Sequence, residues 1–187
     1  METQEDLKQA EESNTPSMGK TALNFGFITG LAIIILNLVF YLTGSLPNSW
    51  FNNLSYLVLV GGIALSMKNF RDEVCGGFIS YGRALGFGTL MVLIASVIYG
   101  LYSFLLFAYI DPDLTKVYLE KTEEQLIINN PDISDEELDM ILAAYEQTLR
   151  PGFRLIGAIF SYTFMGFIFS LIISAFFKKK DPEAVEE

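Results

Sequence analysis

The sequence predicts an all-α membrane protein: a four-helix transmembrane bundle with an extracytoplasmic amphipathic helical hairpin between spans 3 and 4. Three observations predict this class. Hydrophobic residues make up 51% of the 187 positions. They gather into four long runs that no charged side chain interrupts. Acidic residues still outnumber basic ones, 22 to 12, which conflicts with a soluble globule and fits a membrane protein with acidic water-facing parts.

The charge balance and the missing residue types argue against several classes of function. A formal net charge of −10 is unsuited to nucleic acid, because phosphate binding needs clustered Lys and Arg. The chain has no His, which removes a common metal ligand and the usual proton-transfer group near neutral pH. Its single cysteine, Cys75, cannot form an internal disulfide. We therefore expect no cofactor, no metal and no enzymatic activity.

The chain begins with a polar and acidic stretch. Residues 1–20 are predicted to be a disordered acidic cytoplasmic tail, because so polar a segment buries too little apolar surface to offset its ordering entropy. The first span is predicted at 22–42, close to the ~20 residues that cross a ~30 Å hydrocarbon core. Gly26 and Gly30 are four residues apart, so they share a helix face and permit close packing against another helix.

A second span is predicted at 51–67, which is short for a full crossing. A charged, glycine-rich stretch at 68–88 follows it, and basic residues lie close to the spans on both sides. Short loops of this kind are where the positive-inside rule is most reliable, so we place this loop in the cytoplasm. Its candidate interaction residues are Lys68, Arg71, Asp72, Glu73 and Arg83.

The glycines of this stretch do not form a phosphate-binding loop. A Walker loop needs Lys followed by Ser or Thr after its last glycine, and a dinucleotide fingerprint needs a preceding strand in a βαβ unit. Neither condition is met. Gly82 and Gly86 instead repeat the four-residue spacing. We predict a tight turn leading into a glycine-faced third span at 85–109.

Residues 111–150 are predicted to be an acidic helical hairpin. Asp111 before Pro112 is a favourable helix start, and Ser134 with Glu137 has the spacing of a capping box. No EF-hand spacing occurs among the many carboxylates, so we expect a solvated acidic face. The sequence is compatible with contacts of this hairpin either to lipid headgroups or to another protein.

The last span is predicted at 155–177, and its small residues form two short stripes: Gly157 with Ser161, and Gly166 with Ser170 and Ser174. Three lysines follow it directly. Eight basic residues then fall on one side of the membrane, which places both termini in the cytoplasm and the hairpin outside. They are Lys8, Lys20, Lys68, Arg71, Arg83, Lys178, Lys179 and Lys180. The spans therefore occupy 21–110 and 151–180, and 181–187 is a short cytoplasmic tail.

Three motifs in this order resemble the DUF4199 family: GGFISYGRALGFG, the IDPDL that ends the third span, and GFIFSLIISAFFKKK. The resemblance covers roughly residues 20–180. It implies a small four-span protein of the inner membrane of Bacteroidota, with no assigned activity and no catalytic residues to carry over. It also points to a membrane glycosyltransferase of envelope biosynthesis as a partner.

These observations favour a non-enzymatic accessory or structural subunit of an envelope-associated membrane complex. Its expected contacts are membrane lipids and a membrane-protein partner or a second copy of itself. One alternative is a small transporter or channel for a small solute or lipid, which needs polar groups that converge at mid-depth. The candidates for these are Asn37, Tyr99, Tyr102, Ser103 and Ser161. A second alternative is a membrane enzyme acting on a lipid-linked substrate through the charged cytoplasmic loop.

Overall fold

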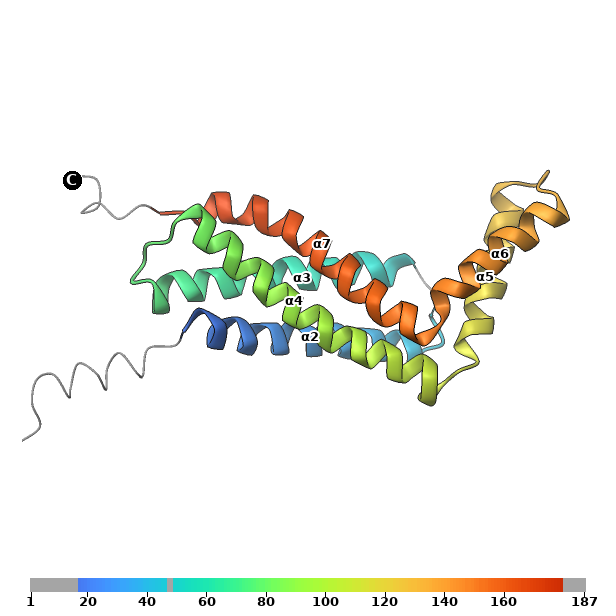
Figure 1. The fold of residues 1–187 in the computed structure, drawn as a ribbon, viewed down its shortest axis with the longest axis horizontal. Coiled ribbons are helices and arrows are strands. Elements are labelled where there is room, and N and C mark those ends of the chain that lie inside the picture. Colours follow the sequence, from blue (N-terminus) through green and yellow to red (C-terminus); the bar gives the residue numbers. More distant parts are fainter. Residues whose placement is uncertain (1–16, 47–48, 180–187) are drawn as a thin grey trace, which may run out of the picture.

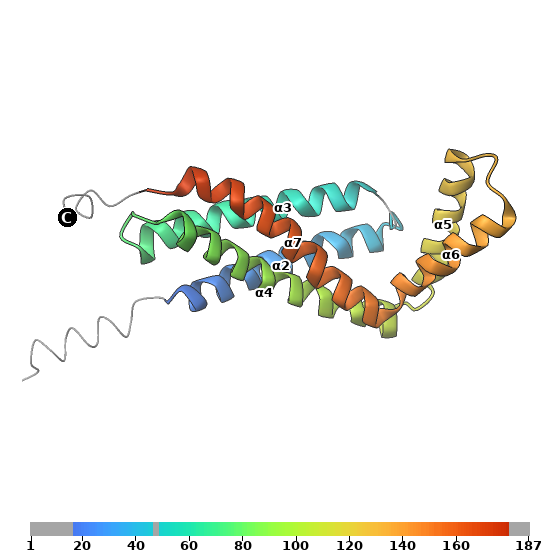
Figure 2. The ribbon, with the colours of Figure 1, turned by 45° about the horizontal axis from the view of Figure 1, so that its top comes forward.

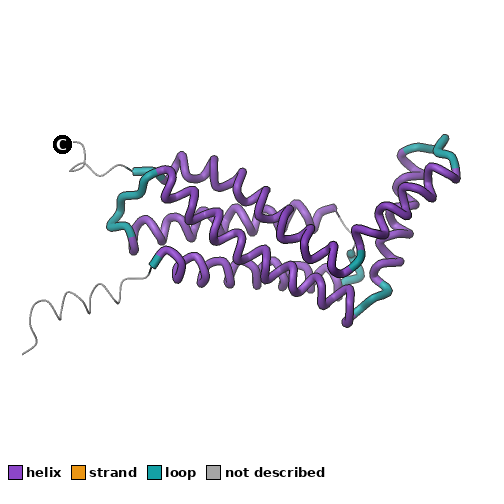
Figure 3. Tube along the Cα trace, in the orientation of Figure 1, coloured by secondary structure: helices purple, strands orange, loops and turns teal. Residues whose placement is uncertain are grey.

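The computed structural model describes residues 17–46 and 49–179, and the chain is helical over most of them (Figure 3). The elements are α2 (Met18–Leu42), α3 (Ser49–Asn69), the π-helical turn η1 (Phe70–Val74), α4 (Tyr81–Leu105), the π-helical turn η2 (Leu106–Ile110), α5 (Leu114–Asn129), α6 (Asp135–Leu149) and α7 (Pro151–Phe177). Within the described ranges there is no β-strand, only an isolated bridge between Ile79 and Lys179.

Four of these helices, α2, α3, α4 and α7, lie side by side along one long axis (Figures 1 and 2). Successive helices run in alternate directions. The α3–α4 loop therefore lies at one end of the bundle, which we call the loop end. At the opposite end α5 and α6 project away from the bundle and pack against each other, and we call it the hairpin end.

The core of the bundle is centred on α4, which packs against both α2 and α7. Its inward side chains Phe87, Met91 and Val92 are fully buried. Glycines on the neighbouring helices allow this close packing. A Cβ added at Gly26 would lie 2.7 Å from the carbonyl oxygen of Met91, and at Gly166 it would collide with Val92. The absence of these side chains lets the helix backbones approach.

Three helical stretches are long and apolar enough to cross a membrane: Met18–Leu42, Tyr81–Ile110 and Pro151–Phe177. Large apolar side chains such as Phe176, which is 82% exposed, point outward from them, as expected where lipid replaces water. These helices are consistent with an integral membrane protein. Among the described residues, α3 is not one of the stretches that meet this length and apolarity, so four crossings stay a prediction.

Two predicted helix starts need correction. Most of the predicted tail lies outside the described residues, but residues 18–20 already belong to α2, which Ser17 caps through the amide of Lys20.

The predicted start at Asp111 is also wrong, because α5 begins only at Leu114. The Asp111 carboxylate accepts a hydrogen bond from the hydroxyl of Tyr41 at 3.1 Å, so it ties α2 to this turn and does not cap a helix.

The second hairpin helix starts where the sequence places it. The Ser134 hydroxyl accepts from the backbone amide of Glu137 at 3.3 Å, and α6 begins at the next residue, Asp135. This confirms Ser134 as the N-cap. Three acidic residues in the first turn of α6 complement the positive end of the helix dipole.

Candidate functional site

The charged stretch of the loop end is tied down by ion pairing and ring contacts. The Nε of Arg71 lies 2.7 Å from Oδ1 of Asp72, and the Arg71 guanidinium lies 5.5 Å from the centroid of the Phe177 ring. The hydrogen bond from Arg71 holds the pKa of Asp72 below its usual value. Lys68 and Glu73 are exposed. These charges stay on the surface of the loop end.

The turn that follows is closed by backbone and aromatic contacts. Gly76 and Gly77 both have positive φ, 63° and 88°, a conformation that side chains disfavour. Ile79 and Lys179 exchange two backbone hydrogen bonds of 3.0 Å, which joins the turn to the end of α7. The loop end is therefore fastened to both α3 and α7.

Arg83, in the first turn of α4, contacts an aromatic ring of the loop end. Its guanidinium lies 5.6 Å from the centroid of Phe70, and the Phe70 ring stacks on Phe87 at 4.2 Å. Of the predicted interaction residues, the structure therefore brings Arg71 and Asp72 together and directs Arg83 to an aromatic ring. No three carboxylate or cysteine side chains gather into a metal-binding group anywhere in residues 17–46 and 49–179.

Some predicted helix-packing residues lie between helices of this chain. A Cβ at Gly30 would lie 3.0 Å from the carbonyl oxygen of Ala95 on α4. Gly26 and Gly166 face α4 in the same way. Ser170 is fully buried beside Gly88. These positions set the distances between α4 and its neighbours.

The other predicted packing residues face outward. A Cβ at Gly82 or Gly157 would meet no atom within 4 Å, and at Gly86 it would meet only the tip of Met18. Ser161 is exposed. None of these four residues is needed to bring two helices of this chain close together.

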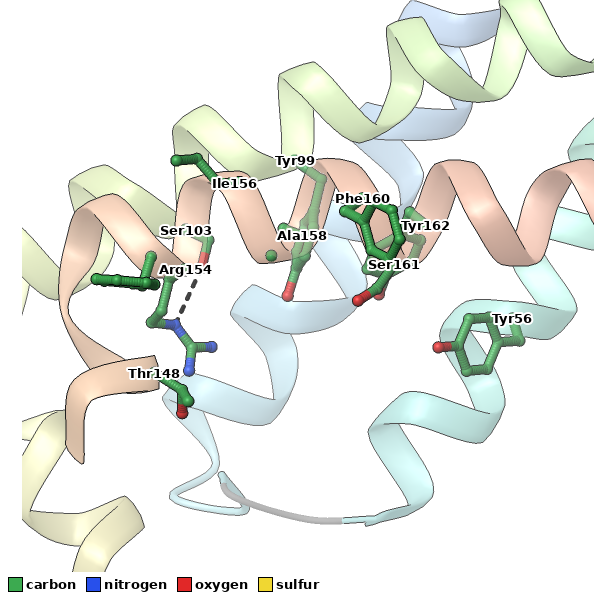
Figure 4. Close-up of a pocket in the computed structure, with 12 residues that line it drawn as sticks. Tyr56, Tyr99, Ser103, Thr148, Arg154, Ile156, Ala158, Phe160, Ser161 and Tyr162 are labelled. Atoms are coloured by element: carbon green, nitrogen blue, oxygen red, sulfur yellow. Dashed lines mark hydrogen bonds between the residues drawn. The ribbon is translucent and has the colours of Figure 1, made fainter. Parts of the chain in front are cut away.

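The hairpin end contains a cavity of about 590 Å³ where α3 and α7 diverge (Figure 4). We call it the tyrosine cavity. Its wall comes from α3, α4, α6 and α7, and its polar lining consists of hydroxyl groups and one guanidinium. These belong to Tyr56, Tyr99, Ser103, Thr148, Arg154, Ser161 and Tyr162. The candidates Tyr99, Ser103 and Ser161 meet here, whereas Asn37 and Tyr102 hydrogen-bond each other at 3.0 Å and do not line it.

The aromatic wall of the cavity is held in place from α3. The hydroxyl of Tyr162 donates to Oγ of Ser55 at 3.1 Å. Its ring lies 5.0 Å from that of Tyr99 and 5.8 Å from that of Tyr56, measured between centroids. Rings at these distances stabilise one another through edge and offset contacts. The tyrosines therefore form a rigid wall.

Among the described residues that line the cavity, Arg154 is the only one with a charged side chain. Its Nε donates to Oγ of Ser103 at 3.3 Å, and its guanidinium lies 3.8 Å from the centroid of Phe107 and 5.2 Å from that of Tyr118. Burial raises the pKa of the Tyr118 hydroxyl, which keeps it neutral beside the cation. Among the described residues, Arg154 forms no salt bridge.

Arg154 was not among the residues singled out from the sequence, because it lies just before the predicted start of the last span at 155. The feature of the sequence that could have identified Arg154 is its position three residues after Pro151. A proline at N1 starts a helix, and the structure starts α7 there, so Arg154 lies in the first turn of a membrane-length helix. Together with the hydroxyls it can bind an anion or a polar headgroup. None of the described residues that line the cavity has a carboxylate that could act as a general base.

A second hollow, of about 660 Å³, lies between α2 and α4, and we call it the apolar groove. Its lining is aliphatic and aromatic except for one amide, that of Asn24. Asn24 is exposed, and no described residue is within hydrogen-bonding reach of its side chain. This groove is separate from the tyrosine cavity, since the two share no lining residue.

The family described as a protein of unknown function, DUF4199, matches residues 24–179 of the chain. No curated protein matches the sequence. No solved structure matches it either.

Proposed function

The chain belongs to the DUF4199 family, and from this premise we propose that it is a non-enzymatic accessory or structural subunit of an envelope-associated complex in the inner membrane. The apolar groove and its single amide carry this proposal. The chemistry of the loop end supports it, because Arg71 pairs with Asp72 and the guanidinium groups of Arg71 and Arg83 lie against aromatic rings.

We assign four spans to the protein, with α3 as the second. α2 and α4 run in the same direction along the bundle, so α3 must return the chain across the same thickness (Figure 1). Lys20, Lys68 and Arg83 lie in the turns of α2, α3 and α4 nearest the loop end, and Lys179 bridges to Ile79 there. The positive-inside rule then places this end in the cytoplasm and α5 and α6 outside.

The position of Asn24 makes the apolar groove more than a lipid-facing surface. Gly26, two residues further along α2, packs against Met91, which is ten residues after the first residue of α4, Tyr81. At 1.5 Å per residue, Asn24 therefore lies roughly 12 Å inside the start of α4. On its own helix, Asn24 is six residues, about 9 Å, beyond the first residue Met18. An exposed amide that faces lipid tails gains no hydrogen bond from them, and leaving it unpaired is costly.

A helix from another membrane protein provides what lipid does not. Amides in membrane-spanning helices typically hydrogen-bond across a helix–helix interface. A two-fold contact between two copies requires a self-complementary surface, and a concave groove facing an identical groove leaves a gap. We therefore propose that a membrane-spanning helix of a different protein occupies the apolar groove and pairs with Asn24. A glycosyltransferase of envelope biosynthesis is one candidate.

The proposal is tested by photo-crosslinking in native cells. A photoreactive residue replaces Phe27, which lines the groove and is 53% exposed, or Leu57 on α3, which is 67% exposed and serves as the control outside the groove. We expect the Phe27 position to capture one membrane protein, identified by mass spectrometry, and the Leu57 position to capture none. Asn24→Leu is expected to abolish that product.

Two results would overturn the accessory role. One is that both positions yield the same set of products, which indicates random collisions in the membrane. The other is that the Phe27 position captures only a second copy of this chain, which means that the groove serves self-association.

A further inference from the structure

The tyrosine cavity contains the positive charge of Arg154, for which no described residue provides a counter-ion. Taking a guanidinium out of water is costly unless it is paired. Here Ser103 takes one N–H of Arg154, and the rings of Phe107 and Tyr118 lie against its guanidinium. Arginine has five N–H donors in a planar fork. These contacts position the side chain and leave its charge without a counter-ion among the described residues.

The opening of the cavity is apolar. Phe153, Ile156 and Phe160 also line it, and they are 60%, 68% and 70% exposed. The cavity therefore has a polar and basic interior, lined by Arg154 and the Tyr99 and Tyr162 hydroxyls, and an apolar opening where it meets the membrane (Figure 4). A ligand that matches both parts carries a negative headgroup and a hydrocarbon chain.

The depth of the cavity fits the headgroup region. Arg154 lies three residues after Pro151, the first residue of α7, so it is about one turn inside the hairpin end. Lipid headgroups and membrane tyrosines occupy this level in membrane-spanning bundles. The start of α7 adds the partial positive charge of a helix N-terminus.

We propose that the tyrosine cavity binds the phosphate headgroup of an anionic membrane lipid, with Arg154 pairing with the phosphate and the acyl chains lying against Phe153 and Phe160. The guanidinium fork matches a phosphate through two parallel hydrogen bonds. This inference uses the membrane placement proposed above and is independent of the partner in the apolar groove.

The experiment is native mass spectrometry of the full-length protein released from detergent with dioleoyl-phosphatidylglycerol or dioleoyl-phosphatidylcholine. We expect the wild type to retain phosphatidylglycerol in preference. Arg154→Gln should weaken this retention by roughly tenfold or more, the usual effect of losing a charge-assisted hydrogen bond. Arg150→Gln is the matched control, because Arg150 is exposed, does not line the cavity and precedes Arg154 by one helical turn.

A second pair of variants keeps the test decisive if Arg154→Gln is unstable. Gly157 lines the cavity and Gly61 lies on α3 outside it, and an added Cβ meets no atom within 4 Å at either position. Gly157→Leu should project a side chain into the cavity beside Arg154 and abolish the preference for phosphatidylglycerol, whereas Gly61→Leu should retain it. Neither change alters the apolar groove, so crosslinking at Phe27 should persist in both.

Equal retention of the two lipids by the wild type would overturn the proposal. Unchanged retention of phosphatidylglycerol in Gly157→Leu would overturn it as well. Inorganic phosphate provides the remaining arm: if it displaces phosphatidylglycerol from the wild type at an equal concentration, the site binds a free anion and the lipid assignment fails.

Discussion

The two ends of the bundle differ in how their polar groups are used. At the loop end, Arg71 pairs with Asp72, and Ile79 exchanges backbone hydrogen bonds with Lys179. At the hairpin end, Arg154 has an aromatic and hydroxyl surrounding and no carboxylate partner among the described residues. The comparison teaches that charge alone does not mark a site in this protein. Arg71 at the loop end has a carboxylate partner within the chain, whereas the guanidinium in the tyrosine cavity is open to a ligand.

The largest expected difference between the ends comes from core aromatics. Phe87 is fully buried and stacks on Phe70, whereas Phe153 is 60% exposed at the mouth of the cavity. Phe87→Ala should lower the free energy of unfolding by about 2 kcal/mol. This is less than the ~3–5 kcal/mol typical of water-soluble cores. In a membrane, the side chain faces lipid in the unfolded state, so its removal does not cost the free energy of transfer from water.

Phe153→Ala should leave the free energy of unfolding within about 0.5 kcal/mol of the wild type. Steric trapping in bicelles measures both variants under the same conditions. Equal destabilisation by the two substitutions would contradict the difference in packing between the ends.

A second comparison uses the same substitution at one glycine from each end. A Cβ at Gly88 would lie 2.6 Å from Oγ of Ser170 and 3.0 Å from Cε of Met67. Gly88→Leu should therefore overpack the contact between α4 and α7 and cost about 1–2 kcal/mol. Gly157→Leu should cost less than about 0.5 kcal/mol, since nothing lies within 4 Å of its Cβ position. Thermal unfolding in detergent ranks the two, and a reversed order would show that the close approach is not a constraint.

The fold was largely predictable from the sequence, because hydrophobic length and caps are local properties. Four apolar runs predicted four long helices, and Ser134 predicted where α6 begins. The prediction that a helix starts at Asp111 was wrong because the Asp111 carboxylate accepts a hydrogen bond from Tyr41, a tertiary contact, and does not cap a helix.

The candidate site was only partly predictable. Tyr99, Ser103 and Ser161 were singled out as polar residues of the spans, and they line the tyrosine cavity. Arg154 was not, because its role depends on which residues surround it once α7 packs on α4. The cavity exists because α3 and α7 diverge toward the hairpin end (Figure 2). The hydrophobic periodicity of a sequence predicts a helix but does not predict the angle between two helices.

The smallest effect is expected from a single hydroxyl. Tyr162→Phe removes the hydrogen bond to Ser55 and keeps the ring contacts with Tyr56 and Tyr99. Hydrogen bonds between membrane helices contribute about 0.6 kcal/mol on average, so we expect a loss of that size in the free energy of unfolding. A loss above about 2 kcal/mol in steric trapping would mean that this bond, and not the rings, holds the cavity wall.

The central claim is that the two ends of the bundle lie on opposite sides of the membrane, with the loop end inside. Cysteine labelling in spheroplasts tests it most directly. Cys75 reports on the loop end, and Gln125→Cys in a Cys75→Ala background reports on the exposed surface of α5. An alkaline buffer is used because burial raises the pKa of the Cys75 thiol and lowers its thiolate fraction.

With a membrane-impermeant maleimide, we expect Gln125→Cys to react in closed spheroplasts and Cys75 to react only after the membrane is opened. If α3 did not cross the membrane, the pattern would reverse. Labelling of Cys75 in closed spheroplasts would therefore contradict the four-span arrangement and the assignment of each end to its side.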